Sequence, residues 1–234
     1  RGITPFYEPG LDALVKKHHK RDKLTFTTSL AEGVKHGVVI FIAVGTPPKP
    51  NGDADLSSVE KVCRDIARAM TSYRVVVEKS TVPVETSRWL HRTLSMNLKK
   101  KIAFDVASNP EFLREGSAVK DFMQPDRIVL GTESKKAEKL LLDVYRPIKA
   151  TKLRTDIASA ELIKHASNSF LATKISFINA VSQICDRVGA DVEKVAEGMG
   201  LDPRIGKSFL NAGAGYGGFC FPKDIEAFIH MAGR

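Results

Sequence analysis

Short apolar runs that alternate with amphipathic stretches constrain the fold of this chain more than any other feature. The strongest run, Val38–Val44, is seven residues long and is typical of a strand buried on both faces of a sheet. Shorter runs at Val75–Val77 and Ile128–Leu130, and a weaker one at Ile102–Ala107, predict further strands. Between the strands, helical spacing predicts helices at 56–70, 84–98 and 134–145. This alternation indicates an α/β fold with a parallel sheet and helices packed on its faces.

The pattern changes near Asp156, where helical spacing alone takes over. Apolar residues recur every three or four positions up to Val188, and no proline or glycine interrupts them before Gly189. This predicts one helix of roughly 30 residues, ~45 Å long at 1.5 Å per residue. Such a helix typically bridges domains or forms a dimer interface. We therefore expect two domains, residues 1–153 with the sheet and residues 154–234 all helical.

Composition excludes several classes of protein. Hydrophobic residues make up 43% of the 234 residues and charged residues 27%, an ordinary balance for a soluble domain with a filled core. The longest apolar run is too short to span a bilayer, so no membrane partner is expected. The net charge of +9 suits an anionic partner or a solvated, lysine-rich surface. Because no nucleic-acid-binding motif accompanies the charge, we expect the solvated surface and no nucleic-acid partner.

Three widely spaced cysteines, Cys63, Cys185 and Cys220, argue against a disulfide framework and indicate a reducing, cytoplasmic compartment. No cysteine or histidine cluster has zinc-ligand spacing, so no metal is expected. Cys220 follows a glycine-rich loop, and Pro222 suits the first position of a helix. At a helix N-terminus the dipole favours a thiolate, with Asp224 close by. A nucleophile is the functional interpretation of Cys220, and a buried structural cysteine is the alternative.

The glycine-rich loop itself, Gly213–Gly218, fits the pattern G-x-G-x-x-G by letter. The dinucleotide fingerprint must follow a strand and open a helix, whereas this loop lies in the helical half. We therefore reject it as the cofactor fingerprint. A phosphate-binding loop and a flexible linker both remain open.

Polar residues collect where predicted strands end. Val44–Pro48 follows the strongest strand, Glu78–Pro83 the next, and Ser108–Gly116 the one after. Since ligands bind at the carboxyl ends of parallel strands, the three loops favour a ligand site at that edge. In the helical half, Lys164 and Asn168 lie four residues apart on one face of the long helix. A solvated lysine is the alternative to one aimed into a site.

Together these residues resemble the UDP-glucose 6-dehydrogenase family, within the UDP-glucose/GDP-mannose dehydrogenases. The shared motifs, which span nearly the whole chain, are Tyr7-Glu-Pro-Gly-Leu11, Val44-Gly-Thr-Pro47, Glu78-Lys-Ser-Thr-Val-Pro83, Asn109-Pro-Glu-Phe-Leu113, Lys164-x-x-x-Asn168 and Gly215-Tyr-Gly-Gly-x-Cys-Phe-Pro-Lys-Asp224. The resemblance implies a partial Rossmann-like NAD-binding domain followed by an all-helical central, dimerisation domain. It also implies NAD as the cofactor and a homodimer built on the long helix.

The activity implied by the resemblance is the NAD-dependent, four-electron oxidation of UDP-glucose to UDP-glucuronate, for nucleotide-sugar and polysaccharide biosynthesis. A cysteine attacks the aldehyde to give a thiohemiacetal, and a second hydride transfer leaves a thioester that water hydrolyses. The implied catalytic residues are Cys220, Lys164, Asp224, Asn168, Glu111 and Thr81. The implied NAD contacts are Val44, Gly45, Thr46, Pro47, Pro48, Ser80, Thr81, Val82, Glu115 and Lys223. The implied nucleotide-sugar contacts are Glu111, Phe112, Leu113, Arg114, Glu115, Lys164, Asn168, Phe209, Leu210, Asn211, Ala212, Gly213, Gly217 and, toward a neighbouring subunit, Arg204.

The sequence also departs from the family pattern. Family members begin with a strand and a glycine fingerprint and continue into a second nucleotide-binding domain, so we expect an interior fragment with little activity on its own. Phe219 stands where a small residue is usual before the cysteine. Other nucleotide-sugar dehydrogenases, acting on GDP-mannose or a UDP-N-acetylhexosamine, remain alternatives. So do a single-step β-hydroxyacid dehydrogenase and an inactive binding module.

Overall fold

The structure, a computed structural model, describes residues 3–218 and 220–233, with the side chain of Cys220 also outside the described part. The chain packs as two compact units. The first comprises Arg1–Thr46 and Leu56–Leu162, and the second comprises Pro47–Asp55 and Ile163–Arg234. The packing thus divides inside the long helix, between Leu162 and Ile163, whereas the domain boundary was predicted at 153.

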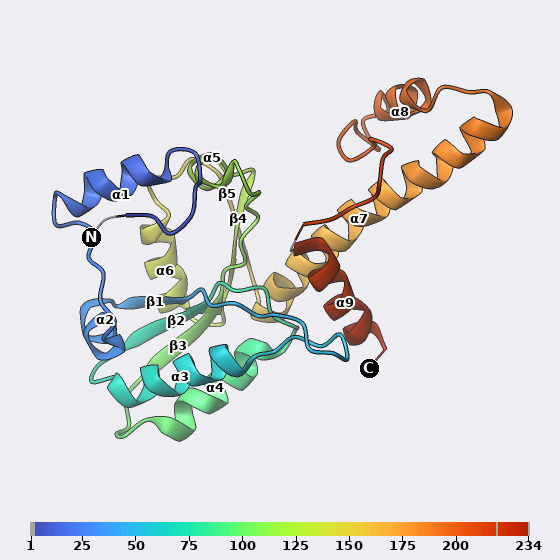
Figure 1. The fold of residues 1–234 in the computed structure, drawn as a ribbon. Helices are drawn as coiled ribbons and strands as arrows, with labels where there is room; N and C mark the ends of the chain where they lie inside the picture. Colours follow the sequence, from blue (N-terminus) through green and yellow to red (C-terminus); the bar gives the residue numbers. More distant parts are fainter. Residues whose placement is uncertain (1–2, 219, 234) are drawn as a thin grey trace. The chain divides into compact units, whose positions relative to one another are not determined.

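The described residues of the first unit form a five-stranded sheet in the order β1-β2-β3-β4-β5 (Figure 1). The strands are β1 Val39–Ile42, β2 Arg74–Glu78, β3 Phe104–Ser108, β4 Arg127–Gly131 and β5 Thr151–Thr155. The first three pair in parallel, as do β4 and β5. The wholly parallel sheet predicted above is corrected at one place, because β3 and β4 are antiparallel and meet at Ser108 and Gly131. The carboxyl ends of β1, β2 and β3 lie in register, so the loops that follow them share one edge.

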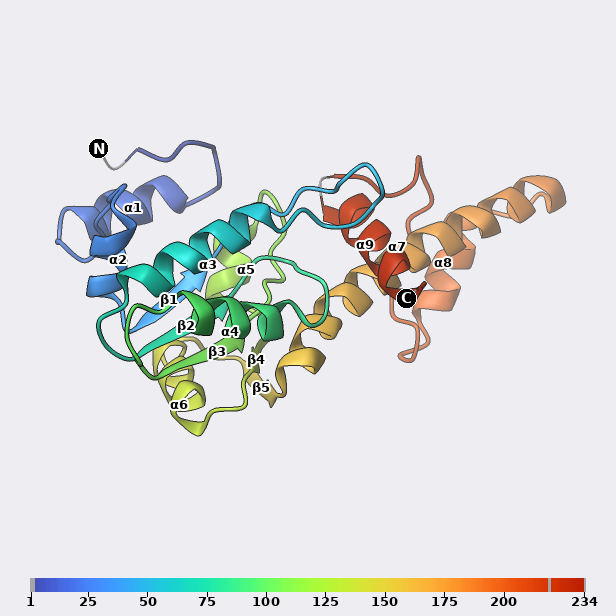
Figure 2. The same cartoon turned by 90° about the horizontal axis from the view of Figure 1, so that it is seen from below.

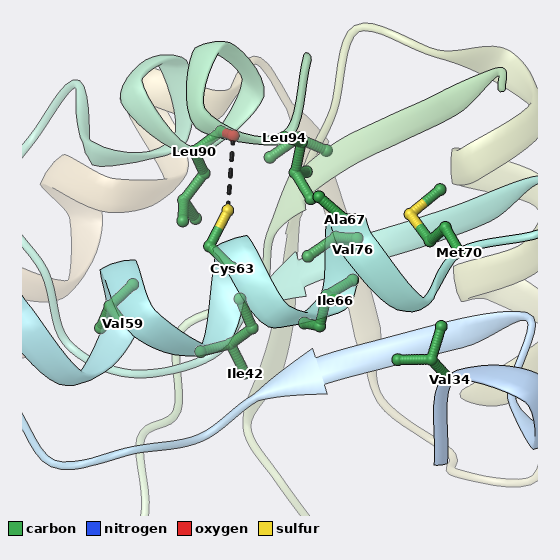
Figure 3. Packing of buried hydrophobic residues seen from close by; sticks show 11 residues of the cluster. Val34, Ile42, Val59, Cys63, Ile66, Ala67, Met70, Val76, Leu90 and Leu94 are labelled. Atoms are coloured by element: carbon green, nitrogen blue, oxygen red, sulfur yellow. Dashed lines mark hydrogen bonds between the residues drawn. The ribbon is translucent and has the colours of Figure 1, made fainter. Parts of the chain in front are cut away.

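Helices cover both faces of this sheet (Figures 1 and 2). The helices of this unit are α1 Leu11–His19, α2 Leu30–His36, α3 Ser57–Ala69, α4 Thr86–Asn97, α5 Ala118–Met123 and α6 Lys135–Val144. One face is covered by α2, α3 and α4 and the other by α6. Alternate side chains of a strand point to opposite faces. On one face Val76 packs with α3 and α4 around Cys63, as Figure 3 shows, and on the other Val75 and Val77 pack with Leu141 of α6.

The second unit is helical. Its helices are α7 Ile157–Val188, which begins in the first unit, α8 Val192–Gly200 and α9 Cys220–Ala232. The prediction of one helix of about 30 residues is confirmed, since α7 has 32. Gly189 follows it with φ +72°, and Asp191 caps α8 by accepting from two backbone N–H groups. Where β4 ends, Gly131 has to be glycine, because an added Cβ would lie 2.5 Å from Ala160 Cβ on α7.

Some predictions of local structure were wrong. β1 is only partly buried and Val38 before it is 49% exposed, because among the described strands β1 pairs with β2 alone. Pro222 is the third residue of α9 and not the first. β5 was not foreseen, because its sequence is mostly polar and exposed. None of the helices in the described part of the chain has the length and apolar character needed to cross a membrane.

Candidate active site

Side-chain hydroxyls tie together the loops that follow β1 and β2. The Ser80 hydroxyl donates to the Val44 carbonyl (2.7 Å) and accepts from the Val44 N–H (2.9 Å). Next to it, Thr46 Oγ1 donates to the carbonyl of Thr81 (2.8 Å). The structure therefore brings four residues predicted to bind NAD to the carboxyl edge of the sheet. Gly45, between them, is exposed and faces open space where a Cβ would project.

The other residues predicted for the cofactor make none of these hydrogen bonds. Val82 is buried in the first unit, and Glu115 is exposed in the loop after β3. Pro47 and Pro48 belong to the second unit, where Pro48 pairs with Ala54 across a short hairpin. The first unit therefore holds only part of the predicted cofactor set.

Two buried carboxylates hold the ends of the loop after β2. Glu78, the last residue of β2, accepts from the Ser80 N–H through Oε1 (2.9 Å), while its Oε2 has no hydrogen-bond partner among the described residues. Burial raises the pKa of Glu78 to about 8, and nearby Glu161 adds to the rise. Glu161 accepts from the N–H groups of Glu85 (2.8 Å) and Ser87 (2.9 Å), and burial raises its pKa as well.

Asn109 fixes the start of the loop after β3. Its amide nitrogen donates to the Val129 carbonyl (2.8 Å), and its amide oxygen accepts from the Tyr145 hydroxyl. The Lys79 ammonium donates to the carbonyl and the amide oxygen of Asn109, both at 3.2 Å. The loops after β2 and β3 are therefore joined by a buried polar network.

The same loop carries the acidic and aromatic residues predicted for the substrate. Glu111 Oε2 accepts from the Leu113 N–H (2.6 Å), so this carboxylate partly shapes its own loop. The Arg127 guanidinium lies over the Phe112 ring, 4.0 Å from its centroid. Of the predicted contacts, Glu111, Phe112 and Leu113 are thus each partly buried and held in place.

Arg114 of this loop is paired with Asp121 of α5. Its guanidinium donates to the carboxylate at 2.7 and 3.0 Å, and its backbone N–H donates at 3.0 Å. These hydrogen bonds hold the pKa of Asp121 well below its usual range. Arg114 therefore helps to fix the loop in which the substrate contacts are predicted.

In the second unit, polar side chains from α7 and α9 meet in a buried cluster. Lys164, Asn168 and Asp224 are all buried. Asn168 Nδ2 donates to Asp224 Oδ2 (2.6 Å), and the Lys223 ammonium lies 2.9 Å from Asp224 Oδ1. We call Lys164, Asn168, Lys223 and Asp224 the polar cluster. The surface-exposed alternative for Lys164 is thereby removed.

Cys220 begins α9, four residues and about 6 Å of helix rise before Asp224. Its backbone therefore lies one turn from the polar cluster. The prediction that its thiol is a nucleophile concerns a side chain outside the described part, and Phe219 lies outside the described residues altogether. Chemically, a thiol next to an ammonium group and a carboxylate can lose its proton and attack a carbonyl carbon.

The loop that leads into α9 contains the remaining predicted substrate contacts. Phe209 has φ +65°, an uncommon conformation for an aromatic residue, and Leu210 is buried. The Gly213 N–H donates to Asn179 Oδ1 on α7 (2.8 Å). The other predicted contacts in this loop are exposed; they are Asn211, Ala212 and Gly217. The loop thus runs beside α7 with several backbone groups open to solvent.

Arg204 lies in the preceding turn and is exposed. Its guanidinium pairs with Asp202 at 2.7 and 3.0 Å, which raises the pKa of Arg204 and lowers that of Asp202. Lys174 of α7 donates to the carbonyl of Ile205 (3.0 Å), so the turn is fixed against the helix. The guanidinium predicted to reach a neighbouring subunit is therefore presented at the surface.

The sequence patterns missed several buried carboxylates that shape these loops, chiefly Glu78, Glu161 and Glu8. Glu78 and Glu8 belong to two of the family motifs, but no role was predicted for either side chain. Glu161 lies three residues before Lys164, in the first turns of α7, and no local pattern marked it. A carboxylate flanked by apolar residues at the start of a helix is the signal that was available.

Comparison with known proteins identifies relatives over the whole chain. Residues 1–149 match the model of the UDP-glucose/GDP-mannose dehydrogenase family, NAD binding domain, and residues 158–234 match the central domain of the same family. UDP-glucose 6-dehydrogenase YwqF of Bacillus subtilis (strain 168) is 50% identical over 234 residues, which are 100% of this chain and 53% of that protein. The chain therefore spans about half the length of the curated relatives it matches.

Solved structures give the same result. A UDP-glucose dehydrogenase from the hyperthermophilic archaeon Pyrobaculum islandicum superimposes with a TM-score of 0.96 at 46% identity, over 99% of this chain and 54% of that chain. A GDP-mannose dehydrogenase from Pseudomonas aeruginosa gives a TM-score of 0.83 at 35% identity, over 99% and 55%. These matches confirm the resemblance drawn from the motifs and the Rossmann-like fold.

Proposed function

The chain belongs to the UDP-glucose/GDP-mannose dehydrogenase family, and from this we propose that it carries the catalytic centre of an NAD-dependent UDP-glucose 6-dehydrogenase. The proposed reaction is the four-electron oxidation of UDP-glucose to UDP-glucuronate through a thioester on Cys220. The observation that carries the proposal is the buried polar cluster, in which Asn168 donates to Asp224 at 2.6 Å, one helical turn from Cys220.

NAD is the cofactor of the family domain that matches residues 1–149. The residues that suit it are Val44, Gly45 and Thr46 together with Ser80 and Thr81. Their fit rests on the open space beside Gly45 and on the hydrogen bonds that hold both loops at the carboxyl edge of the sheet. When bound, NAD⁺ supplies the hydride acceptor for each of the two oxidation steps.

The first half of the reaction forms the aldehyde that the cysteine attacks. Oxidation of the C6 alcohol releases a hydride and a proton and leaves an aldehyde. The Cys220 thiol loses its proton and forms a carbon–sulfur bond to the aldehyde carbon, and the carbonyl oxygen becomes an oxyanion. Lys164, with Asn168 beside it, stabilises that oxyanion. Because Lys164 is buried, its charge acts at low dielectric and is worth more than at the surface.

The second half releases the product. Loss of a second hydride from the thiohemiacetal carbon leaves a thioester. Water then attacks the thioester carbon. Asp224 activates this water, and the resemblance implies Glu111 and Thr81 as the residues that position it. The carbon–sulfur bond then breaks, the thiolate of Cys220 returns, and the carboxylate leaves. The covalent tether keeps the aldehyde from escaping between the two oxidations.

For the sugar, UDP-glucose is the proposed substrate. Two relatives named as UDP-glucose 6-dehydrogenases are 50% and 46% identical to this chain, whereas the GDP-mannose dehydrogenase is 35% identical. The proposed sugar-nucleotide contacts are the loop that contains Phe209 and Gly213 and the exposed Arg204.

Cofactor stoichiometry and the variant Cys220→Ser test this function. In the gene product that carries this sequence, two NADH per UDP-glucose support the thioester route, and one NADH supports a single-step dehydrogenase. Cys220→Ser is expected to lower turnover by at least about a thousandfold, because the nucleophile is lost. Turnover by this variant at the wild-type rate, with one NADH per substrate, would overturn the mechanism. GDP-mannose and UDP-N-acetylhexosamines serve as competing substrates.

We further propose a homodimer through α7. Three large apolar side chains, Phe170, Phe177 and Ile184, recur at seven-residue spacing and are each more than half exposed. Such a stripe is typical of a helix that packs on a partner helix. Phe177→Glu is expected to shift the sedimentation coefficient from that of a dimer to that of a monomer. An unchanged coefficient places the dimer contact elsewhere.

A further inference from the structure

Glu8 lies far from the substrate loop in the sequence but is bound to it in the fold. Its Oε2 accepts from the Gly116 N–H (3.0 Å), 108 residues away, and its Oε1 accepts from the Ala118 N–H (2.9 Å). Only 9% of Glu8 is exposed. Hydrogen bonds to a charged acceptor are stronger than those to a neutral one. One carboxylate therefore spans the end of the loop and the start of α5.

The local sequence holds Glu8 in this place. The Leu11 N–H donates to the Glu8 carbonyl (3.0 Å), and Gly10 follows with φ +83°, a conformation that favours glycine. A Cβ added at Gly10 would lie 3.7 Å from Val119 Cγ1, so this segment packs directly against α5. The Glu-Pro-Gly turn therefore presents the carboxylate to the loop.

The loop needs this support because α5 is short and lacks a cap of its own. α5 has six residues, and the hydroxyl of its N-cap residue Ser117 donates to Asp121 Oδ2 (3.1 Å) instead of accepting from the helix. The Ala118 N–H, at the first turn, is therefore satisfied by Glu8. Without Glu8, two partly buried backbone N–H groups would lose their charged acceptor.

The loop held in this way contains the predicted substrate contacts Glu111 to Glu115, of which Glu115 is also a predicted cofactor contact. Three carboxylates accept from backbone N–H groups along the loop. Glu111 accepts from Leu113 and Asp121 accepts from Arg114. Glu8 accepts from Gly116 and Ala118. Of these three carboxylates, Glu8 alone comes from outside the segment between β3 and β4. Its removal would free the far end of the loop while the start remained anchored.

We propose that Glu8 is a positioning residue for this dehydrogenase, holding the loop from Glu111 to Ser117 in the conformation that binds the nucleotide sugar. The inference rests on the proposed function. Glu8 takes no part in the bond-breaking steps. Its removal is therefore expected to raise KM for the nucleotide sugar much more than it lowers kcat. Binding would have to order the loop, and that cost weakens affinity.

The variant Glu8→Gln tests the proposal, because it keeps the shape of the side chain and removes its charge. One of its two terminal atoms becomes a donor and cannot accept from an N–H. Glu133→Gln, an exposed glutamate in the same unit, is the matched control. In the gene product that carries this sequence, we expect Glu8→Gln to raise KM for UDP-glucose about tenfold with kcat within about threefold of wild type. The control is expected to leave both unchanged.

Hydrogen exchange of the peptide that covers residues 113–119 is the second measurement, since it reports the loop without any ligand. We expect faster exchange there in Glu8→Gln and unchanged exchange in the peptides of β2 and α7. Faster exchange with KM within twofold of wild type overturns the proposal, because the bonds are then merely structural. Unchanged exchange also overturns it. A wild-type protein that neither binds nor oxidises UDP-glucose overturns the proposed function, and this inference with it.

Discussion

Buried carboxylates of the first unit accept hydrogen bonds from backbone N–H groups, whereas buried polar side chains of the second unit pair with one another. Glu161 accepts from the N–H groups of Glu85 and Ser87, 76 and 74 residues away. In the second unit Asn168 donates to Asp224 through side chains only. Backbone partners fix loops, while side-chain partners tune charge and reactivity. Loss of the Glu161 anchor should therefore lower stability, and loss of Lys164 in the second unit should lower activity.

The largest effect expected from this comparison is on turnover, at Lys164. Lys164→Ala removes the buried ammonium that we propose stabilises the oxyanion, and loss of one such group typically costs about 10²–10³ in kcat. The urea-denaturation midpoint is expected to change little, because Asp224 keeps Lys223 and Asn168 as partners. Steady-state kinetics and urea denaturation measure the two quantities.

Lys194→Ala, at an exposed lysine on α8, is the control for this pair of measurements. It should leave kcat unchanged. If Lys164→Ala kept at least a third of the wild-type kcat but unfolded at much lower urea, the polar cluster would be structural, and the contrast between the units would disappear.

The next largest effect is on stability, at Glu161. Glu161→Gln keeps the volume of the side chain but cannot accept from both backbone N–H groups and the Ser87 hydroxyl at once. A buried donor left without its acceptor costs about 1–3 kcal/mol, so we expect the free energy of unfolding to fall by roughly 2 kcal/mol. Urea denaturation measures it, with the exposed Glu133→Gln as control. A loss under about 0.5 kcal/mol would mean that Glu161 does not anchor the loop.

Stability should also depend on pH through Glu78. Its carboxyl loses a proton near pH 4.5 when unfolded and near pH 8 when folded, because burial raises the pKa. Between these values the folded state binds more protons, so the free energy of unfolding falls as pH rises, by up to about 1.4 kcal/mol per pH unit. The contribution is fully present below about pH 4.5 and is lost by about pH 8.

Glu78→Gln imitates the protonated carboxyl and should flatten this dependence. The amide oxygen can still accept from the Ser80 N–H, as Oε1 does now. Urea denaturation from about pH 5 to about pH 8 measures the slope for both proteins. Equal slopes in wild type and variant would show that Glu78 does not titrate in this range.

The contrast between the units also explains what the sequence could predict. Periodicity identified α7 and the pair Lys164 and Asn168, because their relationship lies within one helix. The strand that contains Val76 was found for the same local reason. The anchoring roles of Glu8 and Glu161 depend on N–H groups more than 70 residues away, and no local pattern encodes such partners. The motifs were enough to identify the family, but they did not predict which side chains anchor the loops.

The smallest expected effect concerns the cysteine of the first unit, and it sharpens the contrast with the thiol proposed as nucleophile. Cys63 lies on α3 and is fully buried against α4, where its thiol donates to the Leu90 carbonyl (3.6 Å; Figure 3). Burial raises the pKa of Cys63 to about 12, so the reactive thiolate is scarce at neutral pH.

Cys63→Ala should lower the free energy of unfolding by about 1 kcal/mol and leave the iodoacetamide reactivity of the native protein unchanged. Mass spectrometry of the alkylated peptides should find modification at Cys220 and not at Cys63. Faster alkylation of Cys63 than of Cys220 would reverse the assignment of the reactive thiol to the second unit.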